Sequence, residues 1–209
     1  MSSIKLNYIV RLKLIIIIKN SYNSWKSIHL IYLTIKETTI MKRVVINIMF
    51  CLLGIFIINV SFAKSTMIRM YIVTPKNHGK KVGTIIARDS QYGLLLIPRL
   101  YDLSPGEHGI HVHTKPSCAQ NGMAAGEHLD PRNTGKHLGP YNNNGHLGDL
   151  PVLYVNQNGR AITPMLAPKL TVNNIKKHAI IIHVGGDNYS DSPKPLGGGG
   201  ERLACGVIK

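Results

Sequence analysis

Short runs of apolar and β-branched residues, separated by glycine, proline and asparagine, recur along the chain from residue 67 to the C-terminus. Runs of this length with turn-forming residues on both sides are typical of strands. No segment in this region keeps the helical period over several turns. The predicted strands are 67–73, 81–89, 93–100, 109–114, 150–156, 160–166, 178–184 and 202–208. This pattern predicts an all-β fold, an eight-stranded antiparallel Greek-key barrel or sandwich.

Two connections between these strands are too long to be simple turns. They span residues 115–149 and 185–201, and both are rich in glycine. Long loops without secondary structure inside a compact domain are usually functional. We therefore expect the functional residues to lie on these two loops and on the strands that they follow.

A leader-like segment precedes the strands. Two basic residues at 42–43, directly after Met41, are followed by an apolar run at 44–62, and the small residue Ala63 comes before a polar stretch. This order is typical of a secretory signal peptide. We expect a signal peptide at 41–63, cleaved after Ala63, and a mature domain at 64–209. A retained membrane anchor is the alternative, because the 19 residues of the apolar run could just span a bilayer.

Residues 1–40 are basic, rich in isoleucine, and lie ahead of a complete signal that has its own methionine, Met41. We interpret them as an upstream extension that is not part of the fold. A cytoplasmic tail is the alternative.

The net charge of the chain is +15, and the predicted mature domain holds +8 of it, with 17 Lys and Arg against 9 Asp and Glu. The basic residues are scattered singly, without an arginine-rich run or a series of stacking aromatics. This argues against a nucleic-acid partner. Attraction of a small anion remains open.

Two cysteines, Cys118 and Cys205, follow the leader. An even pair in an exported chain is most simply a disulfide, because the compartment is oxidising. Two buried free thiols are the alternative.

Six of the ten histidines lie between His108 and Asp149. His111 and His113 are two residues apart on a predicted strand, so their side chains leave the same face and could reach one ion. If the strand extends as far as His108, that residue has the opposite parity, and we expect its ring to hold the backbone of a loop by hydrogen bonds.

The remaining histidines complete two sets of donors. Three imidazoles and one carboxylate form a four-coordinate shell of the kind that zinc accepts, namely His128, His137, His146 and Asp149. His183 ends an apolar strand and could complete a histidine-rich shell with His111 and His113. Seven donors for two four-ligand sites require one shared imidazole. His128 is the natural bridge, because it lies between the two groups in the sequence.

Several motifs in this order resemble the copper,zinc superoxide dismutase family, in its bacterial exported branch. They are HGIHVH, AAGEHLDP, GKHLGPY, GHLGDLP, IIIHVGGDNYSD and GGGGERLACGVI, and the resemblance runs from about residue 66 to the C-terminus. It implies a β-sandwich fold and a periplasmic location.

By this resemblance, each candidate residue takes a role. The implied copper ligands are His111, His113, His128 and His183, and the implied zinc ligands are His128, His137, His146 and Asp149. Asp187 matches a carboxylate that orients one ligand of each metal. Arg202 matches the arginine that holds the anionic substrate, and Cys118 and Cys205 match the family's disulfide.

The resemblance implies an enzyme with copper and zinc as cofactors and superoxide as its substrate. Alternate reduction and reoxidation of copper would convert superoxide to oxygen and hydrogen peroxide, with His128 and Arg202 as the catalytic residues. We expect no membrane contact after cleavage of the leader, and the sequence leaves a homodimer open. A periplasmic copper- and zinc-binding protein without catalytic activity is the alternative.

Overall fold

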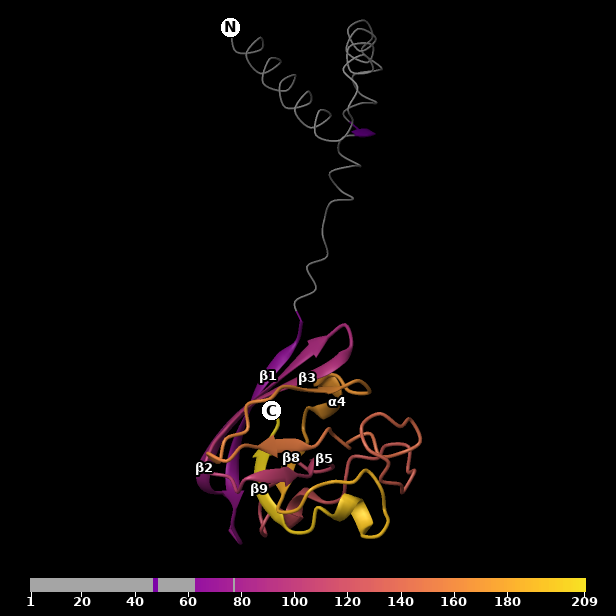
Figure 1. Cartoon of the computed structure of the whole chain (residues 1–209). Helices are drawn as coiled ribbons and strands as arrows, with labels where there is room; N and C mark the ends of the chain where they lie inside the picture. The colour runs from indigo at the N-terminus through magenta and orange to yellow at the C-terminus, as the bar shows by residue number, and fades with distance from the viewer. Residues whose placement is uncertain (1–46, 49–62, 77) are drawn as a thin grey trace, which may run out of the picture. The chain divides into compact units, whose positions relative to one another are not determined.

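The computed structural model describes residues 47–48, 63–76 and 78–209 (Figure 1). The chain divides into two units, Met1–Ser61 and Phe62–Lys209. The predicted extension, and the predicted signal peptide apart from residues 47–48 and Ala63, lie outside the described residues. Within the described residues, no helix has the length and apolar character needed to cross a membrane.

One curled antiparallel sheet dominates the second unit. Its seven strands follow the order β5-β8-β9-β1-β2-β3-β7. They are β1 (Ser65–Val73), β2 (His78–Ser90), β3 (Gly93–Leu100), β5 (Ile110–His113), β7 (Met165–Ala167), β8 (Ala179–His183) and β9 (Arg202–Val207). Strands distant in the sequence are therefore neighbours, since β5 pairs with β8 and β9 pairs with β1. This order is the Greek-key arrangement that the sequence predicts.

A second, two-stranded sheet pairs β4 (Gly106–His108) with β6 (Leu153–Val155). Each of the eight predicted strands overlaps a strand of the structure, although β7 shares only residues 165–166 with the predicted strand 160–166, and β4 is an additional strand that the apolar pattern did not indicate. A one-turn helix, α4 (Val172–Ile175), follows β7. The all-β fold class is confirmed, because helices contribute only single turns to the described residues.

Alternation along the strands determines which side chains enter the core. On β5 and β8, Ile110, Val112, Ile180 and Ile182 point into the main apolar core. The intervening residues of the two strands point to the opposite face, where Ala179 and Ile181 pack with the disulfide. All residues of both strands are nevertheless buried. The opposite face must therefore be covered, and the two long loops cover it.

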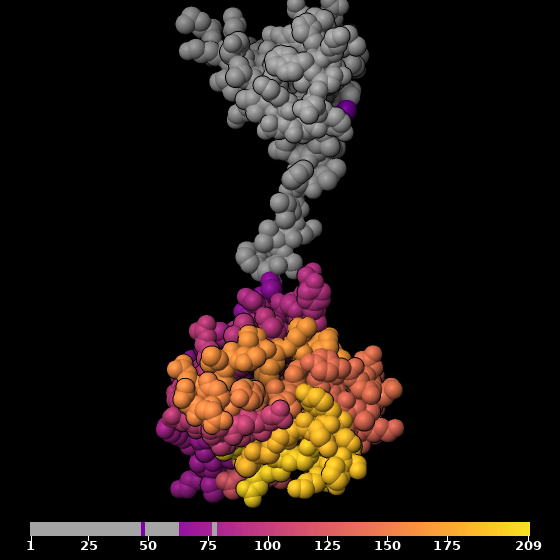
Figure 2. Space-filling view, viewed as in Figure 1, coloured from indigo at the N-terminus to yellow at the C-terminus, as the bar shows by residue number. Residues whose placement is uncertain are grey.

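These loops connect β5 to β6 and β8 to β9. The first contains the 3-10 turn η1 (Met123–Ala125) and the second contains η2 (Pro195–Gly198). The predicted disulfide between Cys118 and Cys205 is formed and links the first loop to β9. In the space-filling view the second loop, in yellow, lies beside the first loop, in salmon (Figure 2).

Candidate metal centre

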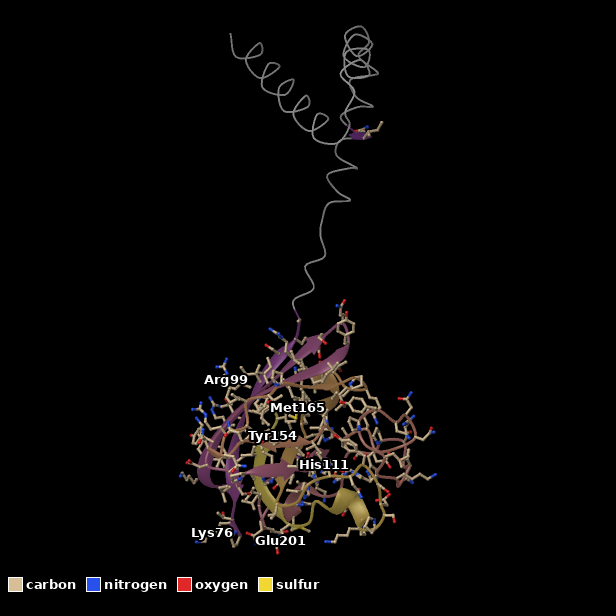
Figure 3. The ribbon with its side chains drawn as sticks, in the orientation of Figure 1. Lys76, Arg99, His111, Tyr154, Met165 and Glu201 are labelled. Atoms are coloured by element: carbon tan, nitrogen blue, oxygen red, sulfur yellow. A yellow bond between two sulfur atoms is a disulfide. The ribbon has the colours of Figure 1, made fainter. Side chains whose placement is uncertain are left out.

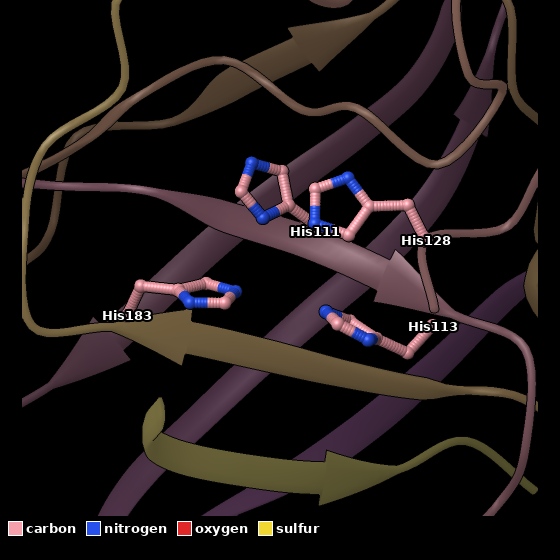
Figure 4. Close-up of side chains that lie close together, drawn as sticks. All are labelled: His111, His113, His128 and His183. Atoms are coloured by element: carbon pink, nitrogen blue, oxygen red, sulfur yellow. The ribbon is translucent and has the colours of Figure 1, made fainter. Parts of the chain in front are cut away.

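Four histidine rings meet on the loop-covered face of the sheet (Figure 4). His111 and His113 are on β5 and His183 ends the neighbouring strand β8. His128, from the first long loop, is brought beside β5 by an isolated β-bridge to His113. The parity argument for His111 and His113 therefore agrees with the positions of both rings. Figure 3 shows His111 inside the domain, whereas Lys76, Arg99 and Glu201 lie at its periphery.

Each of the four rings has one buried nitrogen without a hydrogen-bond partner. These atoms are His111 Nδ1, His113 Nε2, His128 Nε2 and His183 Nε2. One ligand atom from each of the four residues lies within 4.8 Å of the others. Buried polar atoms are rarely left unpaired in folded proteins. Four such atoms in one place indicate a position that a cation fills.

The opposite nitrogens of three rings fix their tautomers. His111 Nε2 donates to Asp187 Oδ2 at 2.8 Å, and His113 Nδ1 donates to the Gly126 carbonyl at 2.8 Å. His183 Nδ1 donates to the carbonyl of Gly200 at 3.1 Å. Because carbonyl and ionised carboxylate oxygens only accept, the protons lie on these nitrogens. The unpartnered nitrogens therefore carry lone pairs, which is the form that binds a metal.

A second group surrounds the carboxylate of Asp149. Its Oδ1 lies 3.1, 3.0 and 3.3 Å from the Nδ1 atoms of His128, His137 and His146. Ligand atoms around a tetrahedral zinc ion, with bonds of about 2.0 Å, lie roughly 3.3 Å apart. The Asp149 carboxylate is itself held, because Oδ2 accepts from the N–H groups of Leu138 and Gly139. The three distances from Asp149 are close to the separation of ligand atoms around zinc.

His128 belongs to both groups. Its Nε2 is unpartnered beside the other three rings of the first group, and its Nδ1 faces Asp149. Its ring also stacks on His111, with centroids 4.0 Å apart.

Asp187 forms hydrogen bonds to one ring in each of the two groups. Besides His111, its carboxylate accepts from His137 Nε2, at 2.8 Å through Oδ1. The side chain is fully buried. One carboxylate therefore contacts a ring in each group, which is the position that the resemblance implies for it.

Burial keeps the first group neutral. It lowers the pKa of His111 to about 3, that of His113 to about 2 and that of His183 to about 4. Desolvation disfavours the charged imidazolium, and the neighbouring rings add to the effect. These rings are therefore unprotonated at neutral pH and available as ligands.

The second group, in contrast to the first, favours positive charge. Burial lowers the pKa of His137, but its hydrogen bonds to Asp149 and Asp187 outweigh burial and raise that pKa to about 9. Burial likewise raises the pKa of Asp149, yet the hydrogen bonds from three histidines hold it well below its usual range. A site with this preference for positive charge suits a divalent cation, which can take the place of the proton.

Arg202, at the start of β9, lies opposite His183 in the strand register. Its Nη1 donates to the Gly122 carbonyl at 2.5 Å, and its Nη2 donates to the Gly126 carbonyl at 2.6 Å. The Gly126 carbonyl also accepts from His113. The guanidinium is thereby fixed beside the first group, and it is only partly buried.

His108 holds backbone by hydrogen bonds, as expected, although it lies on β4 and not on the strand of His111 and His113. Its Nδ1 bonds the carbonyl of His183 at 2.7 Å, and its Nε2 bonds the carbonyl of Ser104 at 2.8 Å. It is absent from the groups of potential ligands found among the described residues.

Three residues that hold the loops were not found from the sequence. Lys169 Nζ donates to the carbonyls of Gly139, Asn142 and His146, at 3.3, 2.7 and 3.1 Å. The hydroxyl of Tyr189 accepts from the N–H of Val152, and Asp191 Oδ2 accepts from the N–H of His137. Tyr189 and Asp191 lie in the same loop as Asp187, which is a signal in the sequence, whereas Lys169 offers none. The backbone partners of all three are far away along the chain.

The comparisons with known proteins agree with this geometry. A family model described as copper/zinc superoxide dismutase matches residues 82–208. A Cu-Zn superoxide dismutase of Photobacterium leiognathi is 48% identical over 145 residues, which cover 66% of this chain and 84% of the relative.

Two solved structures are also similar. The Cu/Zn superoxide dismutase from Brucella abortus is 46% identical, with a TM-score of 0.67, and the match covers 70% of this chain and 100% of that chain. The solution structure of the monomeric enzyme from Salmonella enterica is 51% identical, with a TM-score of 0.63 and the same coverage. Fold, donor groups and sequence identity lead to one conclusion: the chain belongs to the copper/zinc superoxide dismutase family.

Proposed function

We propose that this protein dismutates superoxide with a copper ion and a zinc ion that share the imidazole of His128. As a member of its family the chain is an oxidoreductase that acts on superoxide, with copper and zinc as its cofactors. The proposed copper ligands are His111, His113, His128 and His183, and the proposed zinc ligands are His128, His137, His146 and Asp149.

The observation that carries this assignment is the position of His128. Its Nε2 faces an all-imidazole group, and its Nδ1 faces a group that contains a carboxylate. Nitrogen donors suit copper, whereas three imidazoles with one carboxylate in tetrahedral spacing suit zinc. The two groups therefore differ in the metal that each prefers.

Bound copper supplies the one-electron redox chemistry, because zinc has none. The net reaction converts two superoxide ions and two protons into oxygen and hydrogen peroxide. His128 is placed to hold one of these protons at Nε2 and to pass it to the product. Its other nitrogen, facing Asp149, keeps the ring in position during the transfer.

Arg202 attracts and orients the anionic substrate. Its guanidinium has more N–H donors than the carbonyls of Gly122 and Gly126 use. Its positive charge is permanent. The net positive charge of residues 64–209 also favours the approach of a small anion at low salt.

The rival function is a copper- and zinc-binding protein without catalytic activity. The fixed position of Arg202 beside the first group favours catalysis, because a metal carrier has no use for a substrate-binding cation. Superoxide consumption by the metal-loaded protein, lost on chelation, distinguishes the two functions.

His128→Ala tests the shared imidazole. The variant should lose most of its dismutase activity and bind less zinc, since it removes one ligand from each group. Full turnover with normal zinc content would contradict the proposal.

We also propose the cellular compartment in which the mature protein is located. A formed disulfide fits an oxidising compartment, and we assign the mature protein to the periplasm, with cleavage after Ala63. Residues 1–40 then lie outside the mature protein. Mass spectrometry of the exported protein tests this assignment, and an N-terminus upstream of Met41 would contradict it.

Likeness to the Salmonella enterica protein, described as monomeric, favours a monomer over the homodimer that the sequence left open. Light scattering on the purified protein distinguishes the two states.

A further inference from the structure

Three Asn–Gly pairs occur in the chain, Asn121–Gly122, Asn144–Gly145 and Asn158–Gly159. In such a pair the glycine nitrogen can attack the asparagine carboxamide, because glycine has no Cβ to hinder the approach. The attack requires an exposed asparagine and a glycine N–H that is not held elsewhere. All three asparagines are exposed, so the glycine N–H groups decide between them.

Hydrogen bonding separates the three pairs. The N–H of Gly122 donates to the Cys118 carbonyl at 3.2 Å, and the N–H of Gly159 donates to the Asn156 carbonyl at 2.9 Å. The N–H of Gly145 has no hydrogen-bond partner among the described residues. Where the glycine N–H is hydrogen-bonded, that bond must break before attack, at a cost of about 1 kcal/mol. This cost slows cyclisation by about fivefold. The Asn144–Gly145 pair should therefore cyclise faster than the other two pairs.

The surroundings of Asn144 favour the same reaction. Asn144 lines a surface pocket with Arg132, Thr134 and Lys136. Arg132 is held there by donation from Nη2 to the carbonyl of Asn143. Two cations that line the same pocket favour the negative charge that develops during attack, and they also favour a carboxylate product.

We propose that Asn144 is a site of spontaneous modification that leads to loss of zinc. The nitrogen of Gly145 bonds to Cγ of Asn144, the carboxamide C–N bond breaks, and ammonia leaves with the proton from Gly145. The resulting succinimide adds one water molecule and opens to aspartate or isoaspartate. No oxidant, reductant or enzyme is required.

The position of the pair makes isoaspartate damaging. Lys169 binds the carbonyls of Asn142 and His146, which fixes both ends of the segment that contains the pair. Gly145 is packed tightly, because a Cβ built on it would lie 2.8 Å from Cβ of Leu138. Isoaspartate adds one main-chain carbon, about 1.5 Å of chain. A site tolerates displacements of only about 0.5 Å.

The displaced residue is His146, which belongs to the second donor group and not to the first. Modification should therefore release zinc before copper. This consequence rests on the proposed zinc role of His146, whereas the reactivity of Asn144 does not.

The test is to incubate the copper- and zinc-loaded full chain at neutral pH and physiological temperature. Peptide mass spectrometry and isoaspartate detection follow each Asn–Gly pair, and metal analysis follows zinc and copper. We expect deamidation at Asn144 to be at least about fivefold faster than at Asn158. Equal rates, or faster deamidation at Asn121 or Asn158, would overturn the proposal.

Two variants distinguish the effect of the added negative charge from the effect of the longer main chain. Asn144→Asp adds the carboxylate without the extra carbon and should keep its zinc, since Arg132 and Lys136 line the same pocket as the new charge. Asn144→Gln removes the five-membered cyclisation and should prevent the zinc loss on incubation. If the wild-type protein forms isoaspartate and still keeps its zinc, the proposed consequence is wrong. Normal cyclisation at Asn144 with no zinc in the fresh protein would instead contradict the zinc assignment of His146.

Discussion

Replacing Asp187 by alanine tests how the two donor groups are held together. The carboxylate accepts from His111 Nε2 and His137 Nε2, both at 2.8 Å, and its side chain is fully buried. Alanine leaves two ring N–H groups without partners at a position that has no contact with bulk water. Each buried unpaired donor costs about 1–3 kcal/mol.

The two rings should respond unequally. His111 is on β5, where backbone pairing with β8 holds its main chain, and its ring also stacks on His128. His137 lies in a loop, where its main-chain N–H is held by Asp191 and its ring orientation depends on Asp187. The loss of such an orienting partner typically costs 10–100-fold in metal affinity. We expect a zinc affinity that is lower by about 10–100-fold and a smaller loss for copper.

Competition titrations with a chelator, carried out separately for each metal, measure both affinities. Asp102→Asn is the control, because it removes a carboxylate that is half exposed in an ion pair with Lys80. It should leave both affinities unchanged. Unchanged zinc affinity in Asp187→Ala, or a greater loss of copper than of zinc, would refute the reasoning.

Two further predictions concern the first long loop. Lys169→Met removes an ammonium that binds three carbonyls, so zinc should dissociate about tenfold faster. Stopped-flow transfer of zinc to a chelator measures this rate, with the exposed Lys81→Met as the control, and equal rates would contradict the role of Lys169. Replacing Cys118 and Cys205 together by alanine removes a link across 87 residues. It should lower the free energy of unfolding by about 4 kcal/mol in urea denaturation, and a loss below about 1 kcal/mol would contradict the constraint.

Local patterns in the sequence predicted most of the strands and the positions of the ligands. The two-residue spacing of His111 and His113 requires their rings to share a face on any strand, and this follows from the strand period alone. The position of His108 does not follow from that period, because this residue lies on β4 in the other sheet. The burial of the face that His111 and His113 share could not be predicted, because the loops that cover it are held by contacts between residues far apart in the sequence.

The short elements were missed for physical reasons. β4 has the sequence Gly-Glu-His, which carries no apolar signal, and it exists because β6 pairs with it from far along the chain. α4 is four residues long, too short for a helical period to be detected. Its start does have a local signal, the capping box of Thr171 and Asn174.

The residues that hold the loops could not be predicted from spacing. Lys169 is 23 residues beyond His146 and lies outside both long connections, yet it binds the carbonyl of that residue. Carbonyl groups have no sequence signature, so a lysine that binds three of them resembles any surface lysine in the sequence. The same limit applies to Arg202, whose carbonyl partners at Gly122 and Gly126 are known only from the fold.

The most direct test of the account is anomalous diffraction from crystals of the metal-loaded protein, with data collected at the copper and zinc absorption edges. We predict two separate peaks on opposite sides of the His128 ring. The copper peak should lie among the ring nitrogens of His111, His113, His128 and His183, and the zinc peak among those of His128, His137 and His146 and the carboxylate of Asp149. A single peak, or a His128 ring that contacts only one of two metals, would contradict the shared imidazole.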